Sequence, residues 1–133
     1  MPNDTPIPVQ EYPDIFQYVT VRIAVPDITH TVLYAERDVI IDGMFFVNET
    51  NDADDTLSVG YDTDAADAGT GATDPDNIID AVTINADRTV QDLTGDMLDN
   101  RVPAGRILSA RLTDVGLGDT LGTLIVRFRT ARK

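Results

Sequence analysis

The chain has 133 residues, which fits one domain, and its 23 acidic against 10 basic side chains give a formal net charge of −13. This acidity argues against a nucleic-acid partner, which needs a basic surface, and the lack of cysteine excludes disulfides and thiolate chemistry. No apolar run reaches the roughly 18 residues of a transmembrane helix, and residues 1–5 lack the basic and apolar regions of a secretory signal, so we expect no membrane partner and no export by that route.

The chain opens with a proline-rich segment, MPNDTPIPVQEYPD, over residues 1–14. Proline fixes φ and cannot donate to a strand ladder, so we predict an extended N-terminal arm over residues 1–17, followed by a β-domain over residues 18–133. Two interpretations of the arm are open: a segment that docks on a neighbouring molecule, or a frayed terminus. The apolar side chains available for docking are Ile7, Val9, Tyr12, Ile15 and Phe16.

A period of two begins at residue 18. Apolar side chains alternate with others up to Pro26, which is the pattern of a half-buried strand. Two further strands are predicted over residues 28–35 and 39–48, and Gly43 is expected to mark a bulge or bend in the second of them.

The single histidine, His30, falls on the same side of its strand as Ile28, Val32 and Tyr34. We expect that side to face the core, so we interpret His30 as a packed, hydrogen-bonded side chain. Catalysis of the Ser-His-Asp type would need a nucleophile beside it, and zinc needs more ligands than one histidine without cysteine supplies. We therefore predict no catalytic residues and no enzyme.

Two Asn-x-Thr sequons begin at Asn3 and Asn48. They matter only in a chain that meets a glycosylation machinery. Because no secretory signal is visible, we interpret both as chance occurrences.

Residues 51–77 contain eight aspartates and no lysine or arginine. One interpretation is an acidic surface that maintains solubility; the other is a surface made for molar salt, where the Debye length falls to roughly 3 Å and like charges scarcely repel. The chain has 20 Asp against 3 Glu and 9 Arg against 1 Lys. This bias resembles the proteins of haloarchaea and their viruses, so we predict a halophilic protein.

The same stretch offers carboxylates to a hard cation, which prefers oxygen ligands. Asp62, Asp64 and Asp67 are the weak candidates for a calcium site. An EF-hand beginning at Asp62 fails, because its fifth position is Ala66 and its twelfth is Thr73. We predict a loosely screened loop with no specific metal and no cofactor.

Five more strands are predicted, over residues 57–62, 78–85, 88–94, 106–115 and 122–130, with one helical turn at 96–100. About eight short strands separated by turn residues indicate an all-β fold, either a β-sandwich or a small barrel. The last strand turns Leu124, Val126 and Phe128 inward and Arg127 and Arg129 outward. We interpret Arg127 and Arg129 as part of a basic docking patch for an acidic partner, against the alternative of a solvated strand end.

The chain resembles the small decoration (cement) proteins on the heads of tailed viruses, here of a virus infecting a haloarchaeon. The segments that carry the resemblance are the arm MPNDTPIPVQEYPD, the strands VTVRIAV and LIVRFRT, and VPAGRILSARL. The resemblance implies an antiparallel, jelly-roll-like β-sandwich of about eight strands. It also implies a homotrimer on the outer surface of the virion head that binds the major capsid protein and clamps its lattice.

Three alternatives remain open at this point. Another virion part, such as a tail, fibre or head-tail joining protein, is the nearest. A β-sandwich that binds carbohydrate or a cell surface is less favoured, because the chain has no tryptophan and few aromatic residues for stacking on sugars. An enzyme is least favoured.

Overall fold

The computed structural model describes residues 16–24, 29–50, 55–63, 77–113 and 120–131, and nearly all regular structure in them is β-strand. The elements are β1 (Gln17–Ala24), β2 (Thr29–Tyr34), β3 (Val39–Asn48), β4 (Thr56–Asp62), β5 (Ile79–Thr83), β6 (Val90–Asp92), a 3-10 turn (Thr94–Asp96), β7 (Arg101–Val102), β8 (Ile107–Thr113) and β9 (Leu121–Thr130). These segments are rich in the β-branched and aromatic residues that fit a pleated, half-buried surface.

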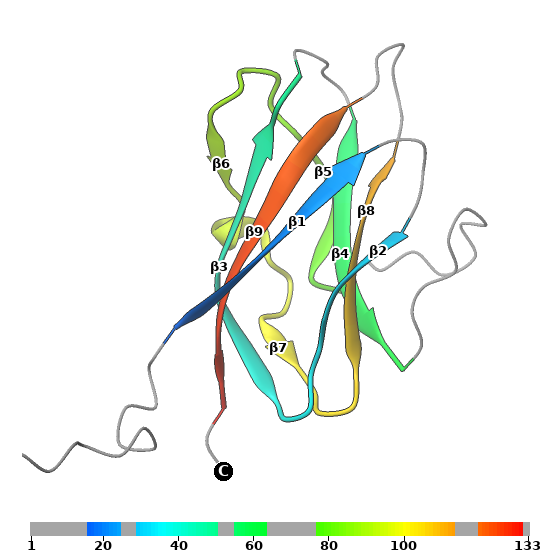
Figure 1. Ribbon diagram of the computed structural model, residues 1–133, viewed down its shortest axis with the longest axis vertical. Coiled ribbons are helices and arrows are strands. Elements are labelled where there is room, and N and C mark those ends of the chain that lie inside the picture. Colours follow the sequence, from blue (N-terminus) through cyan, green and yellow to red (C-terminus); the bar gives the residue numbers. More distant parts are fainter. Residues whose placement is uncertain (1–15, 25–28, 51–54, 64–76, 114–119, 132–133) are drawn as a thin grey trace, which may run out of the picture.

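The described strands form two antiparallel sheets that face each other (Figure 1). The first sheet has the order β1-β9-β3-β6, with β7 also paired to β3, and the second has the order β2-β8-β4-β5. In sequence order, the pairs join strands near the two ends of the chain first and strands near its middle last: β1 with β9, β2 with β8, β3 with β6, and β4 with β5. This is the connectivity of a jelly roll, so the predicted all-β, jelly-roll-like sandwich is confirmed.

The hydrophobic core lies between the two sheets and is supplied by alternate residues of each strand. Leu124 and Val126 of β9 are fully buried, as are Met44 and Phe46 of β3. From the second sheet, Leu57 and Val59 of β4 and Leu108, Ala110 and Leu112 of β8 complete it. The inward positions predicted for Leu124 and Val126 in β9 are therefore correct, and Phe128 packs against the core while partly buried.

Bulges decide which side chains face the core. The register of β3 shifts between Ile41 and Gly43, at the predicted bulge. A second shift, in β2 between Thr31 and Leu33, reverses the alternation there, because one extra residue turns every later side chain to the other face. The prediction that Tyr34 faces inward is therefore wrong: its side chain is 59% exposed.

The middle of the chain departs most from the predicted strands. β5 and β6 are shorter than predicted, and Ala81 (φ 50°) and Arg88 (φ 59°) adopt the left-handed backbone that interrupts regular strands. The helical turn spans Thr94–Asp96 and begins earlier than predicted. The two-residue strand β7 was not predicted.

Asp38 ties together three segments at one end of the sandwich. Its carboxylate accepts hydrogen bonds from the guanidinium of Arg101 and from the backbone N–H of Ala104, the latter at 2.8 Å. Its carbonyl accepts the N–H of Ala131, just after β9, also at 2.8 Å. The hydrogen bond from the Arg101 side chain, followed by that from Ala104, lowers the pKa of Asp38 below its ordinary value of 3.8.

This lowered pKa predicts a pH-dependent effect of Asp38→Asn. A carboxylate whose pKa is lower in the folded state stabilises the fold above its unfolded pKa, and that contribution is lost as pH falls through the lower, folded value. We expect the urea midpoint of the variant to lie below that of the wild type at neutral pH, with the gap closing below about pH 3.8. If the difference between the two urea midpoints stays constant as the pH falls below 3.8, the charge of Asp38 does not contribute to the stability of the fold.

Candidate interaction surface

The outer face of the first sheet carries aromatic and aliphatic side chains where a solvated sheet carries polar ones. Because Leu124 and Val126 point into the core, alternation along β9 turns Ile125 and Arg127 outward. Strand register places Ile125 between Thr20 of β1 and Phe45 of β3. We call this surface the arginine–aromatic face; its members are Phe16, Tyr18, Phe45, Val90, Ile125, Arg127 and Arg129.

Several apolar side chains of this face are open to solvent. Tyr18 is 63% exposed, Val90 62% and Phe16 47%, while Phe45 and Ile125 are half-buried between them. Single exposed apolar residues are common on protein surfaces, but a contiguous apolar area on one sheet face marks an interaction site.

Arg127 lies across the middle of the face between two aromatic rings. Its guanidinium carbon is 5.4 Å from the ring centroid of Phe16 and 5.9 Å from that of Phe45, both within the range of cation–π attraction. Gly43, opposite Arg127 in register, leaves the space it occupies: a Cβ there would lie 3.2 Å from the guanidinium carbon. One guanidinium nitrogen also donates to the carbonyl of Asp42 at 3.1 Å.

The second arginine of the face, Arg129, is partly neutralised. Its Nε lies 3.6 Å from Oδ2 of Asp42, and both side chains are partly buried.

At the β6 side of the sheet, hydrogen bonds from Thr94 lower the pKa of Asp92, and the charge of Arg127 adds a smaller lowering. The arginines are therefore held in fixed positions by the sheet and do not project freely.

The charge of this region is opposite to that of the whole chain. Residues 16–24 and 121–130, which contain β1 and β9, hold three arginines and no acidic residue, in a protein whose net charge is −13. Half of the first sheet is thus basic and apolar. A partner with an acidic surface would meet charge complementarity there and repulsion over much of the remaining surface.

The outer side of the second sheet is different in kind. Leu108, Ala110 and Leu112 face the core, so Ser109 and Arg111 point outward; yet both are buried, as is Ser58 of β4. Polar side chains that are already buried offer little surface to a partner. Of the two outer sheet faces in the described residues, the arginine–aromatic face is therefore the one suited to binding.

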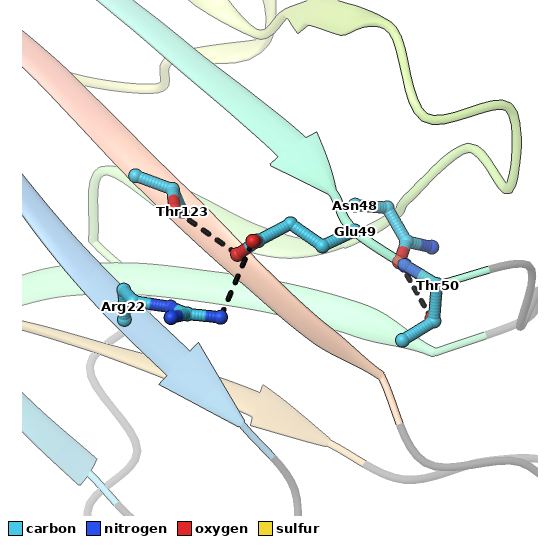
Figure 2. A network of polar contacts seen from close by, with 5 residues as sticks. All are labelled: Arg22, Asn48, Glu49, Thr50 and Thr123. Carbon is cyan, nitrogen blue, oxygen red and sulfur yellow. Dashed lines mark hydrogen bonds and ion pairs between the residues drawn. The ribbon is translucent and has the colours of Figure 1, made fainter.

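A polar network closes the far end of the face, where β1, β9 and β3 meet (Figure 2). Glu49 accepts hydrogen bonds from Arg22 at 3.2 Å and from Thr123 at 3.3 Å. Next to it, Oδ1 of Asn48 accepts from the N–H and the hydroxyl of Thr50 at 2.9 and 2.8 Å. The Arg22–Glu49 pair is exposed and stabilises the fold little, but it fixes the border of the basic region.

The same network explains the sequon at Asn48. Asn48 is 2% exposed, and its amide nitrogen donates to the carbonyl of Asn85 at 2.9 Å. The Asn-Glu-Thr pattern is therefore a turn in which Thr50 bonds back to Asn48. A folded chain does not present this nitrogen to a glycosyltransferase. The sequon at Asn3 lies outside the described residues.

A pocket of about 610 Å³ opens at the other end of the sandwich, where β1 begins and β9 ends. Its lining combines apolar residues at the end of the core with polar ones at the rim: Gln17, Leu33, Tyr34, Glu36, Arg37, Val39, Phe128 and Thr130. Tyr34 is the exposed aromatic residue of this lining.

The structure brings together only some of the residues singled out from the sequence. Phe16 and Arg127 are in contact, and Arg129 lies on the same outer face as Arg127. The other predicted contact residues, Ile7, Val9, Tyr12 and Ile15, lie outside the described residues, and the docking role of the whole set stays a prediction. Gln17, the last residue of the predicted arm, is the first of β1.

In the part of the chain that the structure describes, neither Asp62 nor His30 belongs to a cluster of metal-binding side chains. Asp62 is exposed and accepts from the N–H of Thr63 at 2.6 Å, while Asp64 and Asp67 lie outside the described residues. Within the described ranges, no three His, Cys, Asp or Glu side chains are grouped to hold a metal ion. His30 pairs with Ala110 and is half-buried, but its Nε2 makes no hydrogen bond to the part of the chain that is described.

Sequence reasoning missed Tyr18, Phe45, Val90 and Ile125 as a surface. The available signal was the outward set of the first and last strands, where apolar residues stand at positions that alternation assigns to solvent.

No helix in the described ranges is long and apolar enough to cross a membrane.

Comparison with known proteins gives little beyond this geometry. No family model and no curated protein matches the chain. Among solved structures, a chain of the "Cyanophage Pam1 capsid asymmetric unit" is similar, with a TM-score of 0.44, 13% sequence identity, and coverage of 86% of this chain and 84% of that chain. We draw no functional conclusion from a likeness of this extent.

Proposed function

We propose that the protein is a non-catalytic virion structural protein: a head decoration (cement) protein that binds the major capsid protein lattice on the outer surface of the head. The observation that carries the proposal is the arginine–aromatic face, one apolar and basic sheet face on an otherwise acidic jelly roll. The fold supplies a rigid, flat surface, and the side chains on that surface are those of an interface core, where aromatic residues and arginine are enriched.

The chemistry of the face suits binding in concentrated salt. Screening over roughly 3 Å at about 1 M salt weakens charge attraction, so burial of apolar side chains must supply most of the affinity. Tyr18, Phe45 and Ile125 provide that area, and Arg127, stacked between rings, adds contact with aromatic or carboxylate groups. A homotrimer would present three such faces and multiply weak contacts through effective concentration.

A second function is favoured by the pocket at the end of the sandwich. Tyr34 stands exposed beside Gln17, Glu36 and Arg37, a combination of aromatic platform and polar groups that also suits a carbohydrate. A β-sandwich that binds a surface glycan, on or off a virion, would use this pocket and leave the arginine–aromatic face unused. Substitutions on the two surfaces therefore separate the two functions.

Val90→Asp and Tyr18→Asp test the capsid-binding function. Both side chains are more than half exposed, so each change places a carboxylate on the face with little effect on folding. We expect co-sedimentation with decoration-free heads, in molar salt, to show at least tenfold weaker binding, about 1.4 kcal/mol. The matched control is Tyr34→Asp, an equally exposed aromatic residue outside the face, which should bind heads like the wild type.

Normal head binding by Val90→Asp and Tyr18→Asp would contradict the docking role of the face. Loss of glycan-dependent binding in Tyr34→Asp, with no head binding by the wild type, would instead establish the carbohydrate function. Electron microscopy of the source particle gives the independent check, since the protein should lie on the head lattice and not on a tail or fibre.

A further inference from the structure

The edges of the two sheets are not equally protected. Edge strands expose unpaired N–H and C=O groups to other chains, and proteins normally blunt them with short strands, bulges, prolines or charges. In the described part of the chain the outermost strands are β1 and β6 of the first sheet and β2 and β5 of the second.

Three of these four edges carry such protection. β6 is three residues long. β2 is broken by the register shift between Thr31 and Leu33. β5 contains the left-handed residue Ala81, and its pairing with β4 shifts between Leu57 and Val59.

β1 has no bulge, no proline and no left-handed residue in its strand, and it is not short. It runs for eight residues with an unbroken register against β9, from Gln17 opposite Phe128 to Ala24 opposite Leu121. Its sequence, QYVTVRIA, has no proline, one charged residue and a majority of residues that favour strands. A long, regular and nearly uncharged edge is a template for another strand.

We infer that the free edge of β1 pairs antiparallel with β1 of a second copy of this chain. Each copy has a net charge of −13, so two copies repel each other. In an isologous contact, a surface patch meets the same patch of the partner, so an acidic patch would meet an acidic patch. Residues 16–24 contain no acidic side chain, so two copies can approach there without like carboxylates meeting.

Symmetry and strand chemistry select the register. The first sheets of the two copies form one continuous sheet only if residues directly opposite each other across the two β1 strands point to the same face. A two-fold axis at Thr20 meets this condition. Val19 then lies opposite Val21, a β-branched pair, and Tyr18 lies opposite Arg22, an aromatic–cation pair. The result is one continuous sheet through both copies, in which both arginine–aromatic faces point the same way.

This pairing does not depend on the proposed function. It occupies the edge of β1 and, apart from Tyr18, engages no side chain of the arginine–aromatic face, so it is compatible with binding to a lattice. It requires an even number of copies in any assembly, a dimer when it acts alone and a hexamer when it joins two trimers.

Thr20→Lys and Thr20→Val form the matched pair that tests it. In Thr20→Lys two long, strongly hydrated ammonium side chains would have to lose water at the axis, a cost that salt does not screen, whereas valine keeps the strand propensity and adds no charge. We expect light scattering of the free protein in molar salt to give an even number of copies for the wild type and Thr20→Val. The Thr20→Lys particle should have half that mass, with unchanged far-ultraviolet circular dichroism.

The register has its own test, because the chain contains no cysteine. A single Thr20→Cys substitution places two thiols opposite each other at the axis, so oxidation should join two chains rapidly. Thr31→Cys, at an exposed position on β2, is the control and should not cross-link.

A wild type with one or an odd number of copies, a Thr20→Lys particle of wild-type mass, or equal cross-linking of the two cysteine variants would each overturn the inference. Since heads are absent from these measurements, their outcome is separate from that of the capsid-binding test.

Discussion

Replacing Gly122 with alanine is expected to destabilise the protein by about 3 kcal/mol, the upper end of the range for overpacking a core. Gly122 lies near the start of β9, opposite Ile23 of β1 and Asn48 of β3. A Cβ at this position would lie inside the contact distance of the Phe46 ring and 2.5 Å from the carbonyl oxygen of Val47. The ring can shift only within a packed core, and the carbonyl belongs to a strand, so neither yields easily.

Urea unfolding in molar salt measures this effect, and two further variants identify its cause. Gly95→Ala is the control, because a Cβ there meets nothing within 4 Å, and it should change stability by less than about 0.5 kcal/mol. Phe46→Leu removes the ring atoms that clash, so in the double variant the loss should be clearly smaller than the sum of the two single losses. Additive losses would mean that the two positions do not meet.

Transfer from about 3 M to about 0.1 M salt is expected to abolish the folded signal altogether. At the lower concentration the Debye length is about 10 Å, so the 23 carboxylates repel one another over distances that concentrated salt screens. Circular dichroism and size-exclusion chromatography in the two buffers measure the change. Restoring the salt should restore the fold, because the covalent chain is unchanged and the screening returns.

A chelator provides the contrasting condition. If the acidic residues serve hydration and not coordination, treatment with a chelator in concentrated salt should leave the midpoint of unfolding unchanged. A fold that survives dilution but is lost on chelation would reverse the interpretation of Asp62 and its neighbours as cation-screened residues.

The sequence predicted the strands best where one face of a regular strand is buried. β3, β4, β8 and β9 lie within one residue or two of their predicted bounds, because each is a run of apolar and strand-favouring residues delimited by turn residues. Positions that depend on tertiary contacts were not predictable in this way. The bulge in β2 and the left-handed backbone at Ala81 reverse or end an alternation that continues in the sequence.

The candidate surface was less predictable than the fold. Arg127 and Arg129 were found because a basic pair in an acidic chain is visible in composition alone. Phe16 was named only as an apolar residue of the arm, and Phe45 was not named. These two residues are far apart in the sequence and meet Arg127 only through the order β1-β9-β3. The alternation within one strand predicts which way a side chain points, but it does not predict which strand from elsewhere in the sequence lies next to that side chain.

The position of β9 between β1 and β3 has a consequence during synthesis. Of the described strands, the last to be synthesised is the one that joins the first strand to the third, so the first sheet cannot close until β9 has left the ribosome. Contacts this distant along the chain also form slowly. Chains terminated before β9 would therefore lack Ile125, Arg127 and Arg129, and assembly through this sheet would admit only polypeptides in which β9 has been made.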